Sequence, residues 1–236
     1  MAAPVTSDAA PVDDVTVPAG DGRRPLRTVL MAVIAVGLVL LGGGLAVALG
    51  IGRTEDPTAD SVDAGFSRDM AGHHLQGVEM ANLAFVDDRS ADPEIRTLAF
   101  DISSTQTNQV GRMQGWLSLW GLPLSGGEPM AWMAGDGGHA GHDMAVGGGT
   151  LMPGMATEEE LAHLRGLSGP SFDVEFLRLM IRHHQGGKDM AEYAAQHADV
   201  AAVRDLARSI ARSQTAETTL MARMLSVRGG TPLPAP

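Results

Sequence analysis

The sequence contains no cysteine, and this absence excludes two kinds of site. No disulfide can cross-link the fold, and no thiolate can bind a metal. Any chemistry with a soft metal must therefore use methionine sulfur and histidine nitrogen. Both are plentiful, with 14 methionines and 8 histidines among 236 residues.

Aromatic residues and positive charge are also scarce. Aromatics make up 4% of the chain, and 17 Lys and Arg face 28 Asp and Glu, for a net charge of -11. A nucleic-acid partner requires a positive surface, so this balance argues against one. Few aromatics together with many Ala, Leu and Met residues favour a helical bundle over a β-sandwich or barrel.

The N-terminal part of the sequence resembles a membrane anchor. Residues 1–28 lack apolar periodicity and are predicted to be a disordered cytoplasmic tail. The uncharged apolar run 29–51 is long enough to cross a bilayer as a transmembrane helix. Three arginines between positions 23 and 27 precede it, so the positive-inside rule places everything after it outside the cytoplasm. A cleaved signal peptide is the competing interpretation, because Ala-Val-Ala at 46–48 resembles a cleavage site. The run is longer than a usual signal core, and we favour an uncleaved single-pass anchor.

Two similar stretches, 110 positions apart, dominate the remaining sequence. Residues 66–81 read FSRDMAGHHLQGVEMA, and residues 176–191 read FLRLMIRHHQGGKDMA. Both contain Met-x-x-His-His-x-x-Gly-x-x-Met, and such an internal repeat indicates a duplicated structural unit. The first Met, first His, Gly and second Met share one helical face. The glycines suggest a close helix–helix approach or room for a bound group, and Asp63 and Asp173 precede the two stretches.

The pattern around the repeats predicts two helical hairpins. The four long helices are expected from about Ser61 or Asp63 to Val86, from Pro93 to about Trp120, from Ser171 or Asp173 to His197, and from Asp199 to Arg228. A short helix should begin at the capping box Thr157–Glu160 and end at Gly166. Residues 61–228 thus form an all-α, duplicated four-helix bundle with a Gly-, Met- and His-rich crossover at 121–156, a linker at 52–60 and a tail at 229–236.

The second helix of each hairpin is repeated as well, as Leu-Ala-x-x-Ile-x-x-x-Gln. Together, the two motifs resemble the bacterial domain-of-unknown-function 305 (DUF305) family. The resemblance covers roughly residues 61–228 and implies a ferritin-like helical bundle, an exported location and, for members with a suggested role, copper binding. The family often has Glu three residues after each Gln; the second copy here has Glu217, whereas the first has Gln109.

The repeated histidines and methionines are the candidate metal ligands. Thioethers with imidazoles suit Cu(I), whereas Cu(II) would use mainly the imidazoles. Zinc is possible through four histidines, although the methionines would then be unused. In the alternative interpretation the methionines are ordinary core and the histidines are buried polar contacts. The predicted ligands are His73, His74, His183, His184, Met70, Met80, Met180 and Met190.

Two further groups are predicted to support the site. Gln106 and Gln214 lie on apolar stripes, where they are expected to orient the imidazoles or to reach water at a seam. The crossover resembles flexible metal-trafficking tracts and could form a weaker, exchangeable secondary site, or be a mere spacer. Its candidate ligands are Met130, Met133, His139, His142, Met144, Met152 and Met155.

No enzymatic motif is present, and ferritin-like oxidase activity is not expected. A di-iron bundle needs Glu-x-x-His on two helices, and the single example, Glu160 and His163, lies outside the repeats. The sequence therefore predicts a membrane-anchored, extracytoplasmic protein for copper sequestration or trafficking. A structural or interaction module without metal is the alternative. The sequence does not decide whether the two motifs share one site or form two.

Overall fold

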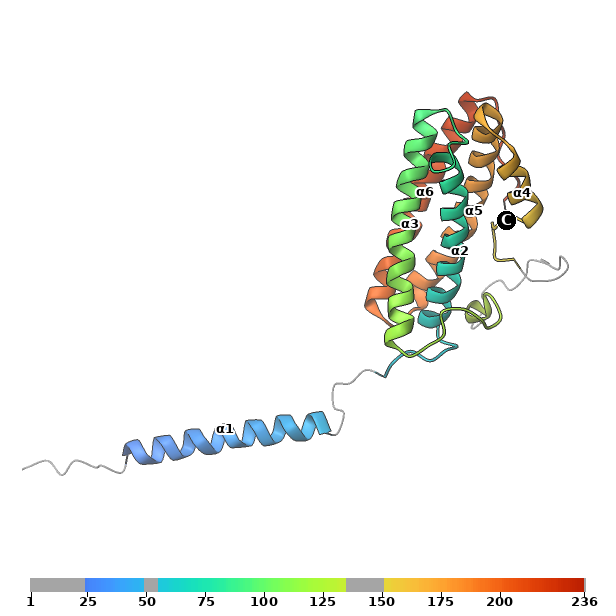
Figure 1. Ribbon diagram of the computed structural model, residues 1–236. Coiled ribbons are helices and arrows are strands. Elements are labelled where there is room, and N and C mark those ends of the chain that lie inside the picture. The colour runs from blue at the N-terminus through green and yellow to red at the C-terminus, as the bar shows by residue number, and fades with distance from the viewer. Residues whose placement is uncertain (1–23, 49–54, 135–150, 236) are drawn as a thin grey trace, which may run out of the picture. The chain divides into compact units, whose positions relative to one another are not determined.

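A computed structural model describes residues 24–48, 55–134 and 151–235 of the chain (Figure 1). These residues form six α-helices and one short 3-10 helix, without a strand among them, so the all-helical prediction is confirmed. The chain divides into two compact units, Met1–Glu55 and Asp56–Pro236, of which the second is called the helical unit below. Most of the predicted N-terminal tail, and His139, His142 and Met144 of the crossover, lie outside the described residues.

Helix α1, Arg24–Ala48, is the described helix of the first unit. Its segment Leu26–Leu45 has a mean hydropathy of 2.4 and no buried residue. By length and composition this helix could cross a membrane, and a signal sequence near the N-terminus would have the same properties.

The helical unit contains the other five helices and the 3-10 helix η1. They are α2 Val62–Phe85, α3 Pro93–Leu119, η1 Ala131–Met133, α4 Glu158–Gly166, α5 Gly169–His197 and α6 Ala201–Val227. Local capping chemistry sets several boundaries: the Ser61 side chain accepts from the Ala64 N–H, and Thr157 and Glu160 form a reciprocal capping box. Helix α5 begins earlier than predicted, because Pro170 is accommodated in its first turn, where no intrahelical N–H is needed.

The four long helices α2, α3, α5 and α6 lie side by side, with α2 packed against α3 and α5, and α5 against α6 (Figure 1). Asp63, in the first turn of α2, accepts hydrogen bonds from the backbone N–H groups of Asp199 and Val200 in the α5–α6 turn. Asp173, in the first turn of α5, accepts from the hydroxyl of Ser90 in the α2–α3 loop. Helices α2 and α5 are therefore antiparallel, and the leading aspartate of each repeat holds the turn of the other hairpin.

Buried side chains follow the same order along all four long helices: apolar, polar, apolar. One apolar cluster includes Met80 and Met180, and the other includes Met70 and Met190. Between them on each helix lie polar residues, which we call the polar layer. The layer comprises His73, His74, Gln106, Gln109, His183, His184, Gln214 and Glu217.

Candidate metal centre

The two His-His motifs face each other across the α2–α5 contact. The ring centroids of His73 and His183 are 3.9 Å apart with an interplanar angle of 31°. The rings of the His73–His74 and His183–His184 pairs are 6.3 Å and 6.2 Å apart. All four side chains are completely buried. The repeats thus bring four imidazoles into one layer, with the two motifs facing each other.

The repeated glycines make room for the imidazole of the opposite motif. A Cβ atom at Gly77 would overlap the Gln106 amide oxygen and lie 3.0 Å from Cε1 of His183. A Cβ atom at Gly187 would lie 2.8 Å from Nε2 of Gln214 and 3.0 Å from Cε1 of His73. The close approach of α2 and α5 therefore accounts for both glycines.

Every imidazole in the layer uses Nε2 to reach an oxygen atom. His73 contacts the Pro153 carbonyl at 3.1 Å, and His183 contacts the His73 carbonyl at 2.9 Å. His74 contacts Oε1 of Gln109 at 2.7 Å, and His184 contacts Oε2 of Glu217 at 2.6 Å. Carbonyl and carboxylate oxygens accept hydrogen bonds, so each Nε2 carries a proton, and in a neutral ring Nδ1 then presents a lone pair.

The four Nδ1 atoms are buried and make no hydrogen bond to any described residue. Burial lowers the pKa of His73 to about 4 and that of His74 to about 3. Burial, reinforced by the neighbouring imidazoles, also lowers the pKa of His183 well below its ordinary value. These rings therefore stay neutral at physiological pH, which is the form that binds a metal ion.

The predicted methionine ligands lie on both sides of the polar layer. Met70 and Met190 belong to one apolar cluster, Met80 and Met180 belong to the other, and all four are fully buried. Within the described residues, no three His, Asp or Glu side chains are grouped closely enough to hold a metal ion. A metal site here would therefore have to combine imidazole with thioether donors, a set that suits a soft ion.

The hydrogen-bond partners of the outer imidazoles differ from those expected. Gln109 and Glu217 contact His74 and His184, whereas no hydrogen bond joins Gln106 or Gln214 to an imidazole. Each actual partner lies three residues after the expected glutamine, on the same helical face. The side chain of Glu217 is 26% exposed. The doubling of the motif could have indicated this position, because both second helices carry a long polar residue there.

The described parts of the crossover pack against the helices. Asp69 accepts hydrogen bonds from the Met130 N–H and from Nε1 of Trp132, both at 2.8 Å. On the other side of the crossover, the backbone of Ala156 pairs with the Gln76 amide, and Pro153 covers Gly186. The described crossover methionines, expected in a flexible tract, are partly buried: Met130, Met133, Met152 and Met155.

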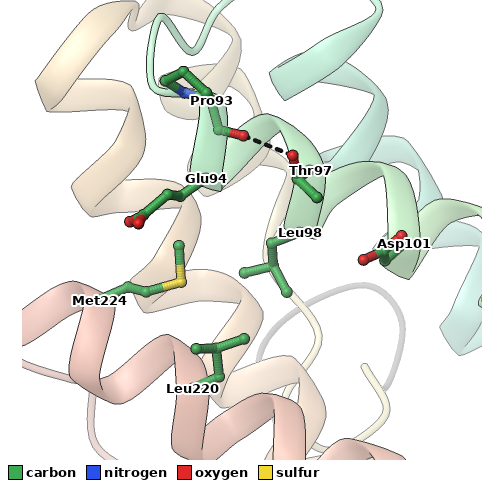
Figure 2. A pocket seen from close by; sticks show the side chains of 7 residues that line it. All are labelled: Pro93, Glu94, Thr97, Leu98, Asp101, Leu220 and Met224. Atoms are coloured by element: carbon green, nitrogen blue, oxygen red, sulfur yellow. Dashed lines mark hydrogen bonds between the residues drawn. The ribbon is translucent and has the colours of Figure 1, made fainter.

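An open groove between α3 and α6 lies apart from the polar layer (Figure 2). Leu98, Leu220 and Met224 form its apolar floor, and Glu94 and Asp101 are its carboxylates. None of the predicted metal ligands lines it. The groove is therefore not part of the candidate metal site.

Comparisons with known proteins agree with the sequence motifs. The model of the DUF305 family, described as a domain of unknown function, matches residues 63–225. A DUF305 protein from Streptomyces coelicolor, described as secreted, is 43% identical with a TM-score of 0.66, over 75% of this chain and 99% of that chain. A DUF305 fragment from Deinococcus radiodurans is 33% identical with a TM-score of 0.55, over 70% of this chain and 96% of that chain. CopM in its Cu(I)-bound form is 25% identical with a TM-score of 0.53, over 71% of this chain and 98% of that chain. No curated protein matches the chain.

Proposed function

This chain belongs to the DUF305 family, and from that premise we propose that it binds copper for sequestration or trafficking in the cell envelope. The observation that carries the proposal is the set of four buried Nδ1 atoms, each without a hydrogen-bond partner. Buried polar atoms are normally satisfied, so four ring nitrogens without a partner in one layer favour a bound cation. The similarity to CopM, whose structure contains Cu(I), supports copper as that cation.

The residues that would hold copper are the imidazoles of the polar layer and the methionines on either side of it. Imidazole and thioether groups are neutral, soft donors that stabilise Cu(I). The Nε2 hydrogen bonds would leave Nδ1 available to the metal, because acceptors behind metal-binding histidines commonly fix the tautomer. Copper is the cargo in this proposal, so no catalytic step is involved. Zinc is the alternative metal, but it would need the imidazoles alone, and no three of the described His, Asp or Glu side chains are grouped closely enough to hold it.

The direct test is the metal content and Cu(I) affinity of the full-length chain in detergent micelles. We expect copper to co-purify at up to one ion per chain, and Cu(I) to be retained against the chelator bicinchoninate. His163→Ala is the matched control, because His163 is an exposed histidine on α4. Failure of the wild-type chain to retain Cu(I) against the chelator would reject the proposal.

We further propose that α2, α3, α5 and α6 form a ferritin-like four-helix bundle. The antiparallel α2–α5 contact and the packing of each hairpin support this architecture. The TM-score of 0.66 to the Streptomyces coelicolor protein supports it as well. A crystal structure of the helical unit would test it through the crossing angles of the four helices.

The proposed location is the cell membrane, with α1 as an uncleaved anchor and the helical unit outside the cytoplasm. The apolar segment Leu26–Leu45 supports the anchor, and the arginines before it support the orientation. A C-terminally tagged chain should remain in the membrane fraction, and protease added outside the cytoplasmic membrane should degrade the tagged unit. A shortened, soluble product would instead indicate signal cleavage.

One observation favours a second candidate function, that of a structural or interaction module. Each imidazole already makes one hydrogen bond, which would be sufficient for a polar layer that only aligns the helices. This candidate predicts a chain that purifies without metal and loses Cu(I) to the chelator. The copper measurement above therefore separates the two functions.

A further inference from the structure

The polar layer is almost symmetric between the two repeats, with one exception. Both repeats have the same residue at four equivalent positions: the two histidines, the glycine and the first glutamine of the second helix. At a fifth equivalent position, α3 carries Gln109 and α6 carries Glu217. Gln109 holds the ring of His74 with an amide oxygen, whereas Glu217 holds the ring of His184 with a carboxylate oxygen. The two halves therefore differ by one negative charge.

The buried carboxylates in the described part of the helical unit are bonded elsewhere. Asp63 holds the α5–α6 turn, Asp69 holds the crossover and Asp173 holds Ser90. Arg182, which directly precedes His183 in the second motif, is paired with Glu160 on α4. Towards the imidazoles, α2 and α5 present neutral His and Gly, α3 presents amides and the crossover presents a carbonyl. Among the described residues, Glu217 is therefore the one charged side chain that forms a hydrogen bond with an imidazole of the layer.

We propose that Glu217 sets the balance between Cu(I) and Cu(II) in the layer, by supplying one negative charge that raises the affinity for Cu(II) more than the affinity for Cu(I). This inference rests on the proposed function. A layer of neutral donors with one carboxylate becomes electrically neutral with Cu(I) but carries a net positive charge with Cu(II). An uncompensated charge in a buried site is costly, so loss of the carboxylate would weaken both complexes, and the complex of the doubly charged ion more. With a second carboxylate at position 109, the same layer would match Cu(II).

The residue at the equivalent position of the first repeat, Gln109, indicates which substitution of Glu217 separates charge from hydrogen bonding. Glu217 also positions His184, because its carboxylate accepts the Nε2–H and leaves Nδ1 free. Gln109 shows that a glutamine can hold the corresponding ring of the other repeat at 2.7 Å. Glu217→Gln should therefore preserve the hydrogen bond and remove only the charge. Gln109→Glu is the reciprocal change, and it gives both halves a carboxylate.

The experiment measures Cu(I) and Cu(II) affinities of the full-length chain in detergent micelles. Bicinchoninate is the competitor for Cu(I), and nitrilotriacetate is the competitor for Cu(II). Because a doubly charged ion responds twice as strongly to a fixed charge, Glu217→Gln should weaken Cu(I) by about tenfold and Cu(II) by more. Glu217→Gln should therefore lower the ratio of Cu(II) to Cu(I) affinity, and Gln109→Glu should raise this ratio by about tenfold. Each tenfold change in this ratio corresponds to about 59 mV in the reduction potential of the bound copper, which provides a second measurement.

Glu192→Gln is the control, since it removes the same charge from a half-exposed side chain that pairs with Lys188. Its affinity ratio should match that of the wild type. If the wild type binds Cu(I) but Glu217→Gln, with unchanged helix content, shifts the ratio by less than about twofold, the inference is overturned and the proposed function stands. If the wild type itself loses Cu(I) to bicinchoninate, the proposed function fails, and the inference fails with it.

Discussion

His183 donates its Nε2–H to the backbone carbonyl of His73 over 2.9 Å, so equivalent histidines of the two repeats are in direct contact. Their rings also stack at 3.9 Å, within the seam where α2 and α5 run antiparallel. Each ring sits over the glycine of the opposite motif. The duplication thus produces one polar layer built from two halves.

Removal of one His-His pair should remove nearly all the bound copper rather than half of it. In the variant His73→Ala/His74→Ala, the remaining imidazoles lose their partners across the seam, because the pairs share one layer. Copper per chain, measured by elemental analysis after dialysis against a chelator, should fall close to zero. Retention of half of the wild-type copper would instead indicate two independent sites. Circular dichroism shows whether the variant keeps its helices.

Gly186→Ala should destabilise the helical unit by about 1–3 kcal/mol. A Cβ atom there would overlap the carbonyl group of Pro153, which is backbone and accepts the hydrogen bond from His73. Gly111→Ala on α3 is the control, because that glycine is exposed with open space around it. The control should gain up to about 1 kcal/mol from helix propensity. Urea unfolding of both variants gives the comparison, and equal stabilities would contradict the covering role of Pro153.

Asp63→Ala should reduce the free energy of unfolding by about 1–2 kcal/mol. Its carboxylate accepts two backbone N–H groups in the α5–α6 turn, and these partly buried hydrogen bonds would be lost. Asp205→Ala is the control. The Asp205 side chain on α6 is 73% exposed, so its removal should change the free energy of unfolding little. Chemical denaturation again provides the measurement. A small effect at position 63 would show that the α5–α6 turn does not depend on the leading aspartate.

Acidification below pH 6.5 should destabilise the copper-free chain. Burial lowers the pKa of His73 to about 4 and that of His74 to about 3, from 6.5 in the unfolded chain. Between these values the unfolded state binds more protons than the folded state. The stability is therefore full above pH 6.5 and falls as the pH drops towards 4, by up to about 1.4 kcal/mol per pH unit for each such histidine. Urea midpoints from pH 7 to about pH 5 should decrease more steeply in the wild type than in His74→Gln. Identical slopes would contradict the burial of a neutral ring.

Much of the helical architecture follows from local patterns. Thr157 caps a helix where the sequence predicted it, and Ser61 is one of the two predicted starts of α2, because capping depends on side chains within three residues of the cap. The role of Pro153 and the partners of the imidazoles were not predictable in this way. Gln109 and Glu217 contact histidines more than 30 positions earlier, a relationship that depends on how each hairpin packs.

The sequence by itself determined the family, the helices and the duplicated motif with its candidate ligands, since periodicity and repeat spacing are local properties of the chain. Only the tertiary structure decided that the two motifs form one layer, that their Nδ1 atoms are left without partners and that one carboxylate contacts the layer. The physical reason is that burial and hydrogen-bond partners depend on the antiparallel packing of α2 against α5, which joins residues 110 positions apart.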